Sequence, residues 1–136
     1  MTGVQTCALP ISGEIQCEKV FEDVGFVAIL EPAPLAPGHV FVFPKQEIES
    51  WLHLEPKDLH ILMNLAQKIA KAIQVVFGCP RVALAAYGLK TPHVHLHLIP
   101  VWGQPGEIDL TRTRLPASAS ELQENAKKIR ATLLNF

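Results

Sequence analysis

Three histidines alternate with apolar residues in the segment HVHLHLI, residues 93–99. His93, His95 and His97 are half of the six histidines in the chain. Because successive side chains of a β-strand point to opposite faces, the pattern predicts a strand with three imidazoles on one face and apolar side chains on the other. Neighbouring histidines on such a strand lie roughly 6.5–7 Å apart, and the outer two about 13 Å apart.

Three interpretations of this histidine row compete. If it is only the polar face of a solvent-exposed strand, the strict alternation is unexplained. If it binds a metal ion, ligand bonds of about 2 Å allow two of the histidines to share the ion and leave the third idle. If it binds a phosphate, all three have a use, since neutral imidazole is a good nucleophile near pH 7 and protonated imidazole donates hydrogen bonds to phosphate oxygens. We favour the phosphate site.

The composition narrows the class of protein. The chain has 136 residues, of which 49% are hydrophobic and 18% charged, as in an ordinary soluble domain. A formal net charge of −1 provides no basic field for nucleic acid or an anionic membrane, and no apolar run is long enough to span a bilayer. Cys7, Cys17 and Cys79 form an odd set without metal-ligand spacing, so we expect a reducing, cytoplasmic setting.

The first residues carry a different signal. GVQTCALPI, residues 3–11, is the direct translation of ggagttcagacgtgtgctcttccgatc, a common sequencing-library adapter. We therefore hypothesise that residues 1–11 are a non-native, adapter-derived segment. The fold prediction is restricted to residues 12–136, which we expect to form one domain.

The next part of the chain predicts strands followed by a helix. FVAIL (26–30) and HVFVF (39–43) predict strands that flank a proline-rich loop, EPAPLAPG (31–38). The helix is expected to begin near Pro56 and to stop at Gly78, a residue typical of a left-handed cap. Its apolar residues recur at helical spacing and form one buried stripe: Leu62, Leu65, Ile69, Ile73 and Val76.

The last part predicts a hairpin and a second helix. RVALAAY (81–87) and residues 93–99 are expected to be strands joined by the turn GLKTP (88–92), the second strand ending at Pro100. Ser118 and Glu121 have the spacing of a capping box at the start of a C-terminal amphipathic helix. This order predicts an α+β fold with a mainly antiparallel sheet, one central helix and one C-terminal helix.

The histidine row and two upstream blocks resemble the histidine triad (HIT) family. Residues 93–99 match its alternating signature, and YGLKTPHVHLHLIP (87–100) is similar to the active-site strand of a bacterial branch. SGEIQCEKVFED (12–23) is similar to the family's opening hairpin, and APLAPGHVFVFPK (33–45) to its loop-strand block. The resemblance covers essentially all of residues 12–136. It implies a compact HIT-like domain that pairs as a homodimer.

The resemblance also implies roles for four histidines. His95 matches the nucleophile that attacks the α-phosphorus of a nucleotide, with its second ring nitrogen donating to a backbone carbonyl. His97 and His39 match positions that contact the phosphate, and His93 matches the histidine that supports the nucleophile from behind. The implied function is a nucleotide hydrolase or transferase that releases a nucleoside monophosphate from a nucleoside phosphoramidate or a dinucleoside polyphosphate. The alternative is a purine-nucleotide-binding module with little or no turnover.

The nucleotide-binding residues follow the family less closely. Ile29 and Leu30 lie in the stretch that holds the base, and Glu31 stands where a ribose-binding aspartate is usual. An alternative for Glu31 is a solvated loop residue. Many members have Gly-Gln-Ser/Thr before the triad, where this chain has GLKTP. Lys90 or Thr91 is expected to assist the leaving group instead, unless Lys90 is only a solvated turn residue.

Some bacterial members also carry a structural zinc ion, bound by an N-terminal Cys-x-x-Cys pair and later histidines. This chain has no such pair, and Glu47 stands where a ligand histidine is common. We therefore expect no metal and no other cofactor.

Overall fold

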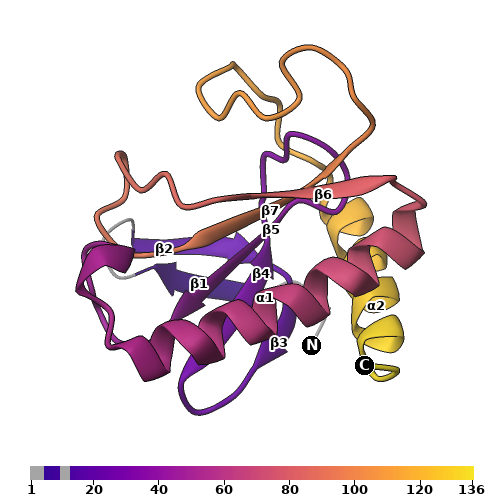
Figure 1. Ribbon diagram of the computed structural model, residues 1–136. Helices are drawn as coiled ribbons and strands as arrows, with labels where there is room; N and C mark the ends of the chain where they lie inside the picture. Colours follow the sequence, from indigo (N-terminus) through magenta and orange to yellow (C-terminus); the bar gives the residue numbers. More distant parts are fainter. Residues whose placement is uncertain (1–4, 10–12) are drawn as a thin grey trace.

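The computed structural model describes residues 5–9 and 13–136, and its centre is a five-stranded sheet (Figure 1). The strand order is β3-β4-β5-β7-β6, and every neighbouring pair is antiparallel. These strands are β3 (Lys19–Glu22), β4 (Phe26–Leu30), β5 (Val40–Pro44), β6 (Arg81–Ala85) and β7 (Leu96–Val101). A separate hairpin consists of β1 (Gln5–Leu9) and β2 (Gly13–Cys17). The α+β class and the antiparallel sheet are as predicted.

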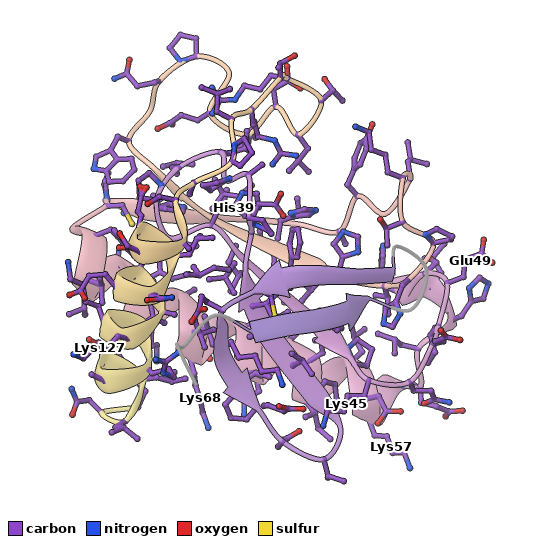
Figure 2. The ribbon with its side chains drawn as sticks, turned by 180° about the vertical axis from the view of Figure 1, so that it is seen from behind. His39, Lys45, Glu49, Lys57, Lys68 and Lys127 are labelled. Atoms are coloured by element: carbon purple, nitrogen blue, oxygen red, sulfur yellow. The ribbon has the colours of Figure 1, made fainter. Side chains whose placement is uncertain are left out.

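Helix α1 covers one face of the sheet, and the β1–β2 hairpin lies on the opposite side (Figures 1 and 2). After a short 3₁₀ helix η1 (Trp51–His53), α1 spans Pro56–Phe77. It stops at Gly78, whose φ of 64° is the left-handed cap expected from the sequence. Helix α2 (Ala119–Leu133) packs against α1 and β3. The Ser118 hydroxyl caps it by accepting a hydrogen bond from the Glu121 N–H at 3.1 Å.

The core fixes which way the histidines face. On the α1 side of the sheet, Val42, Leu96 and Leu98 are buried in one large apolar cluster. Burying a side chain of this size contributes roughly 1.5–3 kcal/mol, and a shift of one residue in β7 would move both leucines to the other face. The side chain of His97 is therefore held on the face away from α1. There Phe41 and Phe43 belong to a second, smaller cluster.

The strand that carries His97 differs from the prediction at both ends. Strand β7 begins at Leu96 rather than at residue 93 and continues through Pro100 to Val101. The register pairs Val42 with Leu96, so Pro44 would stand opposite residue 94, and a proline has no N–H to extend the ladder. At the other end, β5 pairing stops at Leu98, so Pro100 pairs only with β6. At Pro100, the side of β7 that faces β5 makes no backbone hydrogen bonds to a neighbouring strand, and a proline is tolerated at such a position.

Three expectations from the sequence concern the N-terminal segment, the redox state of the compartment and the absence of a membrane span. Of the hypothetical adapter-derived segment 1–11, residues 1–4 and 10–11 lie outside the described residues, and its origin stays a prediction. Cys17 is disulfide-bonded and Cys79 is a buried free thiol, and the expected reducing compartment stays a prediction. Within the described parts of the chain, we find no helix of the length and apolarity that crossing a membrane requires.

Candidate active site

The ring of His95 is held as a neutral imidazole with one nitrogen free. Its Nδ1 lies 2.7 Å from the carbonyl oxygen of His93, and because a carbonyl only accepts, Nδ1 carries the proton. Burial lowers the pKa of His95 below its usual 6.5. The ring is therefore uncharged at neutral pH, and Nε2 keeps the lone pair that a nucleophile needs. This is the bond to a backbone carbonyl that the sequence led us to expect.

His93 supports His95 through its main chain. The His93 ring is buried, and its Nε2–H donates to the carbonyl oxygen of Pro44 at 2.9 Å. The ring also makes a T-shaped contact with Phe43, with ring centroids 5.6 Å apart. These contacts tie residue 93 to the end of β5, and so they fix the carbonyl that orients His95.

A relay of hydrogen bonds from Leu35 through His39 sets the tautomer of His97. The Leu35 N–H donates to Nδ1 of His39 at 3.1 Å, so neutral His39 carries its proton on Nε2. That Nε2–H donates to Nδ1 of His97 at 2.9 Å, which leaves the proton of His97 on Nε2. Burial lowers the pKa of both rings to about 3. His97 therefore offers a neutral N–H donor on the side of its ring that faces away from His39.

This relay bears on two expectations from the sequence. His39 is fully buried in the interior (Figure 2), and it contacts His97 but does not line the cavity beside it. Its expected contact with a phosphate stays a prediction, and its position favours an indirect contact through His97. The expected imidazolium donor is replaced, because a buried ring with a low pKa donates as neutral imidazole.

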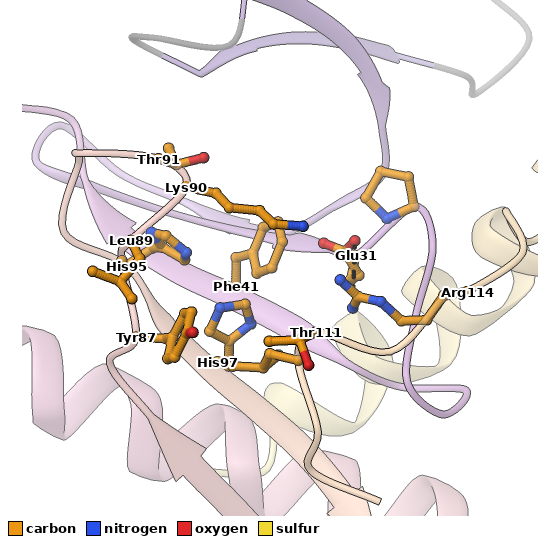
Figure 3. Close-up of a pocket in the computed structure, with 13 residues that line it drawn as sticks. Glu31, Phe41, Tyr87, Leu89, Lys90, Thr91, His95, His97, Thr111 and Arg114 are labelled. Atoms are coloured by element: carbon orange, nitrogen blue, oxygen red, sulfur yellow. Dashed lines mark ion pairs between the residues drawn. The ribbon is translucent and has the colours of Figure 1, made fainter. Parts of the chain in front are cut away.

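The rings of His95 and His97 lie close together at the edge of a cavity. Their centroids are 4.8 Å apart, and Phe41 packs edge-on against both at 5.4 and 4.9 Å. The cavity has a volume of about 350 Å³, which suits a small molecule (Figure 3). Its other walls come from β5 and the loop that precedes it, from the turn at 87–91, and from the segment that follows β7.

The cavity wall also contains an ion pair that is mostly shielded from solvent. Glu31 Oε1 lies 3.8 Å from Nη1 of Arg114, and the two side chains are 11% and 19% exposed. Burial raises the pKa of Glu31 to about 7, and the nearby guanidinium of Arg114 only partly opposes this. The carboxyl is therefore partly protonated at neutral pH. Lys90, on the turn, extends across the cavity toward this pair (Figure 3).

A model of the HIT domain family matches residues 12–102. The chain belongs to the HIT family. The strand with the histidines, most of the residues that line the cavity and the hydrogen bonds that orient His95 and His97 lie within the matched residues, so the resemblance inferred from residues 93–99 is confirmed.

Relatives of this HIT protein include both bacterial and eukaryotic proteins. A HIT-like protein of Chlamydia pneumoniae is 39% identical over 95 residues, which cover 65% of this chain and 86% of that protein. The adenosine 5'-monophosphoramidase hnt1 of Schizosaccharomyces pombe is 27% identical over 124 residues, covering 88% and 90%. The crystal structure of a hypothetical histidine triad nucleotide-binding protein from Sulfolobus tokodaii has a TM-score of 0.77 at 25% identity, covering 89% of this chain and 86% of that one.

The nucleotide-binding residues expected in this HIT protein fall into two groups. Glu31, Lys90 and Thr91 line the cavity. Ile29 and Leu30 do not, because β4 lies between β3 and β5 and is buried on both faces. Ile29 packs in the smaller apolar cluster and Leu30 in the larger one, so both are core residues. The uninterrupted apolar run FVAIL was itself a signal for such a strand.

The sequence did not predict several residues that line the cavity of the HIT protein, Phe41 and Arg114 among them. Phe41 faces the histidines because it pairs with His97 across β5 and β7, and the alternation of residues 39–43 would have placed it there. Arg114 belongs to an irregular segment without a motif, so no sequence pattern pointed to it. Among the described residues, no group of three or more potential ligands is arranged to hold a metal ion. The expectation of no metal and no cofactor stays a prediction.

Proposed function

We propose that this HIT protein is a nucleotide hydrolase or transferase that acts at an α-phosphorus through a covalent nucleotidyl-histidine at His95. One observation carries the proposal. The free Nε2 of His95 and the Nε2–H of His97 belong to adjacent rings at the same cavity. A nucleophile beside a donor for the phosphoryl oxygens is the arrangement that such a displacement requires. The names of the Schizosaccharomyces pombe and Sulfolobus tokodaii relatives support a nucleotide ligand.

In the first step, the Nε2 lone pair of His95 attacks the α-phosphorus. A P–N bond forms, and the bond from phosphorus to the leaving group breaks with its electron pair on the leaving atom. His97 donates its Nε2–H to a nonbridging oxygen while negative charge grows there. Removing one such donor typically slows turnover by about 10²–10³-fold.

The leaving group departs past the turn that replaces the usual Gly-Gln-Ser/Thr. If the leaving atom is an amine nitrogen, it needs a proton, which the Lys90 ammonium or the Thr91 hydroxyl supplies and later recovers from solvent. If the leaving group is a phosphate anion, it needs no proton, and the charge of Lys90 stabilises it. Both a phosphoramidate and a dinucleoside polyphosphate therefore fit the site.

In the second step, water attacks the phosphorus of the nucleotidyl-histidine. The bond from phosphorus to Nε2 breaks, its electron pair returns to the ring, and one water proton leaves to solvent. The nucleoside monophosphate is released and His95 regains its starting state. An acceptor other than water gives transfer in place of hydrolysis.

We place the nucleoside in the remaining part of the cavity. The Phe41 and Tyr87 rings provide apolar surface for a purine base, and the Glu31 carboxyl is available to ribose hydroxyls. None of these contacts uses the attacking nitrogen of His95. Binding should therefore survive the loss of His95.

The test is turnover of adenosine 5'-phosphoramidate and of a diadenosine polyphosphate by wild type and His95→Ala. The proposal expects AMP from at least one substrate with wild type and none above background with His95→Ala. His97→Ala should keep slow, measurable turnover, because it loses a donor and keeps the nucleophile. The alternative, a binding module with little turnover, is favoured by the altered GLKTP turn. It would be supported if wild type bound AMP but hydrolysed neither substrate.

We also propose a homodimer. A groove of about 460 Å³ lies between α1 and the edge strand β6, and exposed apolar side chains such as Met63 and Leu84 line it. Pairing two copies would cover this surface and the unpaired edge of β6. Sedimentation at micromolar concentration should give twice the 15.0 kDa chain mass, and a stable monomer would contradict the proposal.

A further inference from the structure

The cavity has a wall that lies beyond the part of the chain matched by the HIT family. The match ends at residue 102, whereas Leu110, Thr111 and Arg114 line the cavity. These residues belong to the irregular chain between β7 and α2, which extends beyond the sheet in Figure 1. We refer to residues 110–117 as the wall segment.

The wall segment is anchored to the loop that carries the site. The Arg112 guanidinium donates to the carbonyl oxygen of Leu35 at 2.7 Å, and the Ala117 N–H donates to that of Pro32 at 2.9 Å. Leu35 is the residue whose N–H sets the tautomer of His39. The wall segment is thus fixed at two points to the same loop that orients the histidines.

Arg114 is the charged side chain with which the wall segment lines the cavity, and one of its donor atoms is not used. Its Nη1 is buried and has no hydrogen-bond partner within the described residues. The 3.8 Å to Glu31 Oε1 is an ion-pair distance that is too long for a hydrogen bond. A buried donor without an acceptor is unfavourable and uncommon in folded proteins, so this one calls for an acceptor from a ligand.

The charges around Arg114 favour an anionic acceptor. The charged side chains that line the cavity are Lys90, Arg114 and Glu31, two cations against one carboxyl group. Burial raises the pKa of Glu31 to about 7, so this carboxyl competes only partly for the guanidinium at neutral pH. The positive charge of Arg114 also contributes to the lowered pKa of His97, which places both groups within electrostatic reach of each other.

We propose that Arg114 binds a nonbridging phosphate oxygen of the nucleotide and thereby makes the site select phosphorylated over uncharged nucleosides. The inference rests on the proposed function, since it takes the ligand to be a nucleotide whose phosphate lies at His95 and His97. A guanidinium suits this role, because its planar fork donates two parallel hydrogen bonds to a phosphate.

The test compares the binding of two probes, AMP and adenosine, by calorimetry. Arg114→Gln should weaken AMP binding by about tenfold or more and change adenosine binding by less than about twofold, so the preference for AMP falls. Arg114→Lys should retain part of the preference, because it keeps the charge and loses the fork. Arg112→Gln is the matched control, since it disturbs the same segment without removing a cavity cation. It should affect both probes equally or not at all.

The remaining outcomes overturn the inference in distinguishable ways. If Arg114→Gln and Arg112→Gln weaken both probes by the same factor, Arg114 is only part of the wall. If wild type prefers AMP and Arg114→Gln keeps that preference, the inference about Arg114 fails. The proposed function is then still supported if wild type hydrolyses a substrate and His95→Ala does not. If wild type binds neither probe, the nucleotide site itself is refuted, and the role of Arg114 falls with it.

Discussion

Nε2 of His39 lies 2.9 Å from Nδ1 of His97, and this contact connects a backbone amide in the proline-rich loop to the donor at the cavity. The Leu35 N–H fixes the proton of His39, and His39 fixes the proton of His97. The tautomer of a cavity residue is thus determined by a loop residue that lines no part of the cavity. His39 itself is fully buried, so its hydrogen bonds are made inside the protein and away from solvent.

Replacing His39 by leucine should lower both stability and activity. The variant keeps a similar volume but leaves the buried Leu35 N–H without an acceptor, which typically costs about 1–3 kcal/mol. His97 is then free to carry its proton on either nitrogen, so kcat/KM should fall while His95 still turns over substrate. Urea denaturation and steady-state kinetics measure the two effects. His53→Leu, at an exposed histidine, should stay within about 0.5 kcal/mol of wild type, and equal losses in both variants would contradict the relay.

The rings of His39, His95 and His97 should all be neutral at pH 7, and those of His39 and His97 should remain neutral well below pH 6.5. Burial lowers the pKa of His95 and brings those of His39 and His97 to about 3, whereas the unfolded chain protonates near 6.5. Histidine protonation therefore costs stability only as the pH falls below 6.5. Nitrogen-15 NMR should find the proton on Nδ1 of His95 at pH 7 and on Nε2 of His97 at pH 6. An imidazolium signal from His97 at that pH would exclude the neutral donor.

Glu31→Gln should stabilise the protein at pH 8 more than at pH 5. The folded-state pKa of about 7 lies above the ordinary 4.5, so folding favours the protonated carboxyl. Its contribution to stability is full below pH 4.5 and is lost as the pH rises through about 7. The gain from removing the charge should be on the order of 1–3 kcal/mol at pH 8. Urea denaturation at both pH values measures it, and an equal effect at both would show that the carboxyl is not held in its neutral form.

Most of the fold followed from local patterns in the sequence. The period of two in residues 93–99 places the leucines toward α1 and His97 away from it, because one face of the sheet must be buried. Pro56 and Gly78 bound α1 because each suits its position at a helix end. These signals depend on neighbouring residues only, so they are visible without a structure.

The missing parts of the site depend on contacts between distant segments. Arg114 reaches the cavity because residues 112 and 117 bond to the loop at 32–35, and neither bond leaves a pattern in the sequence. His39 resembles a phosphate ligand in sequence, but the strand pairing buries it behind His97. The sequence analysis expected β7 to begin at residue 93, because it did not take into account that Pro44 would stand opposite residue 94 in the neighbouring strand.

Deleting residues 1–11 should leave the domain folded and active. If these residues are adapter-derived, no selection has fitted them to the domain, so the melting temperature should change by less than about 4 °C. The deletion also removes the pairing of β1 with β2, which makes the test a strict one. Thermal denaturation and turnover of the shortened chain provide the measurement. A large loss of melting temperature, or an uninterrupted genomic match through these residues, would identify the segment as native.

The central claim, that His95 is the nucleophile, is tested most directly by trapping the covalent intermediate. A slow nucleotide substrate is mixed with the protein, the reaction is quenched under alkaline conditions, and the peptide of residues 91–112 is fragmented by mass spectrometry. Because this peptide contains three histidines, only fragmentation assigns the site. We predict one nucleotidyl group on His95, and none on the same peptide from His95→Ala. An adduct on His93 or His97, or near-normal turnover by His95→Ala, would contradict the account.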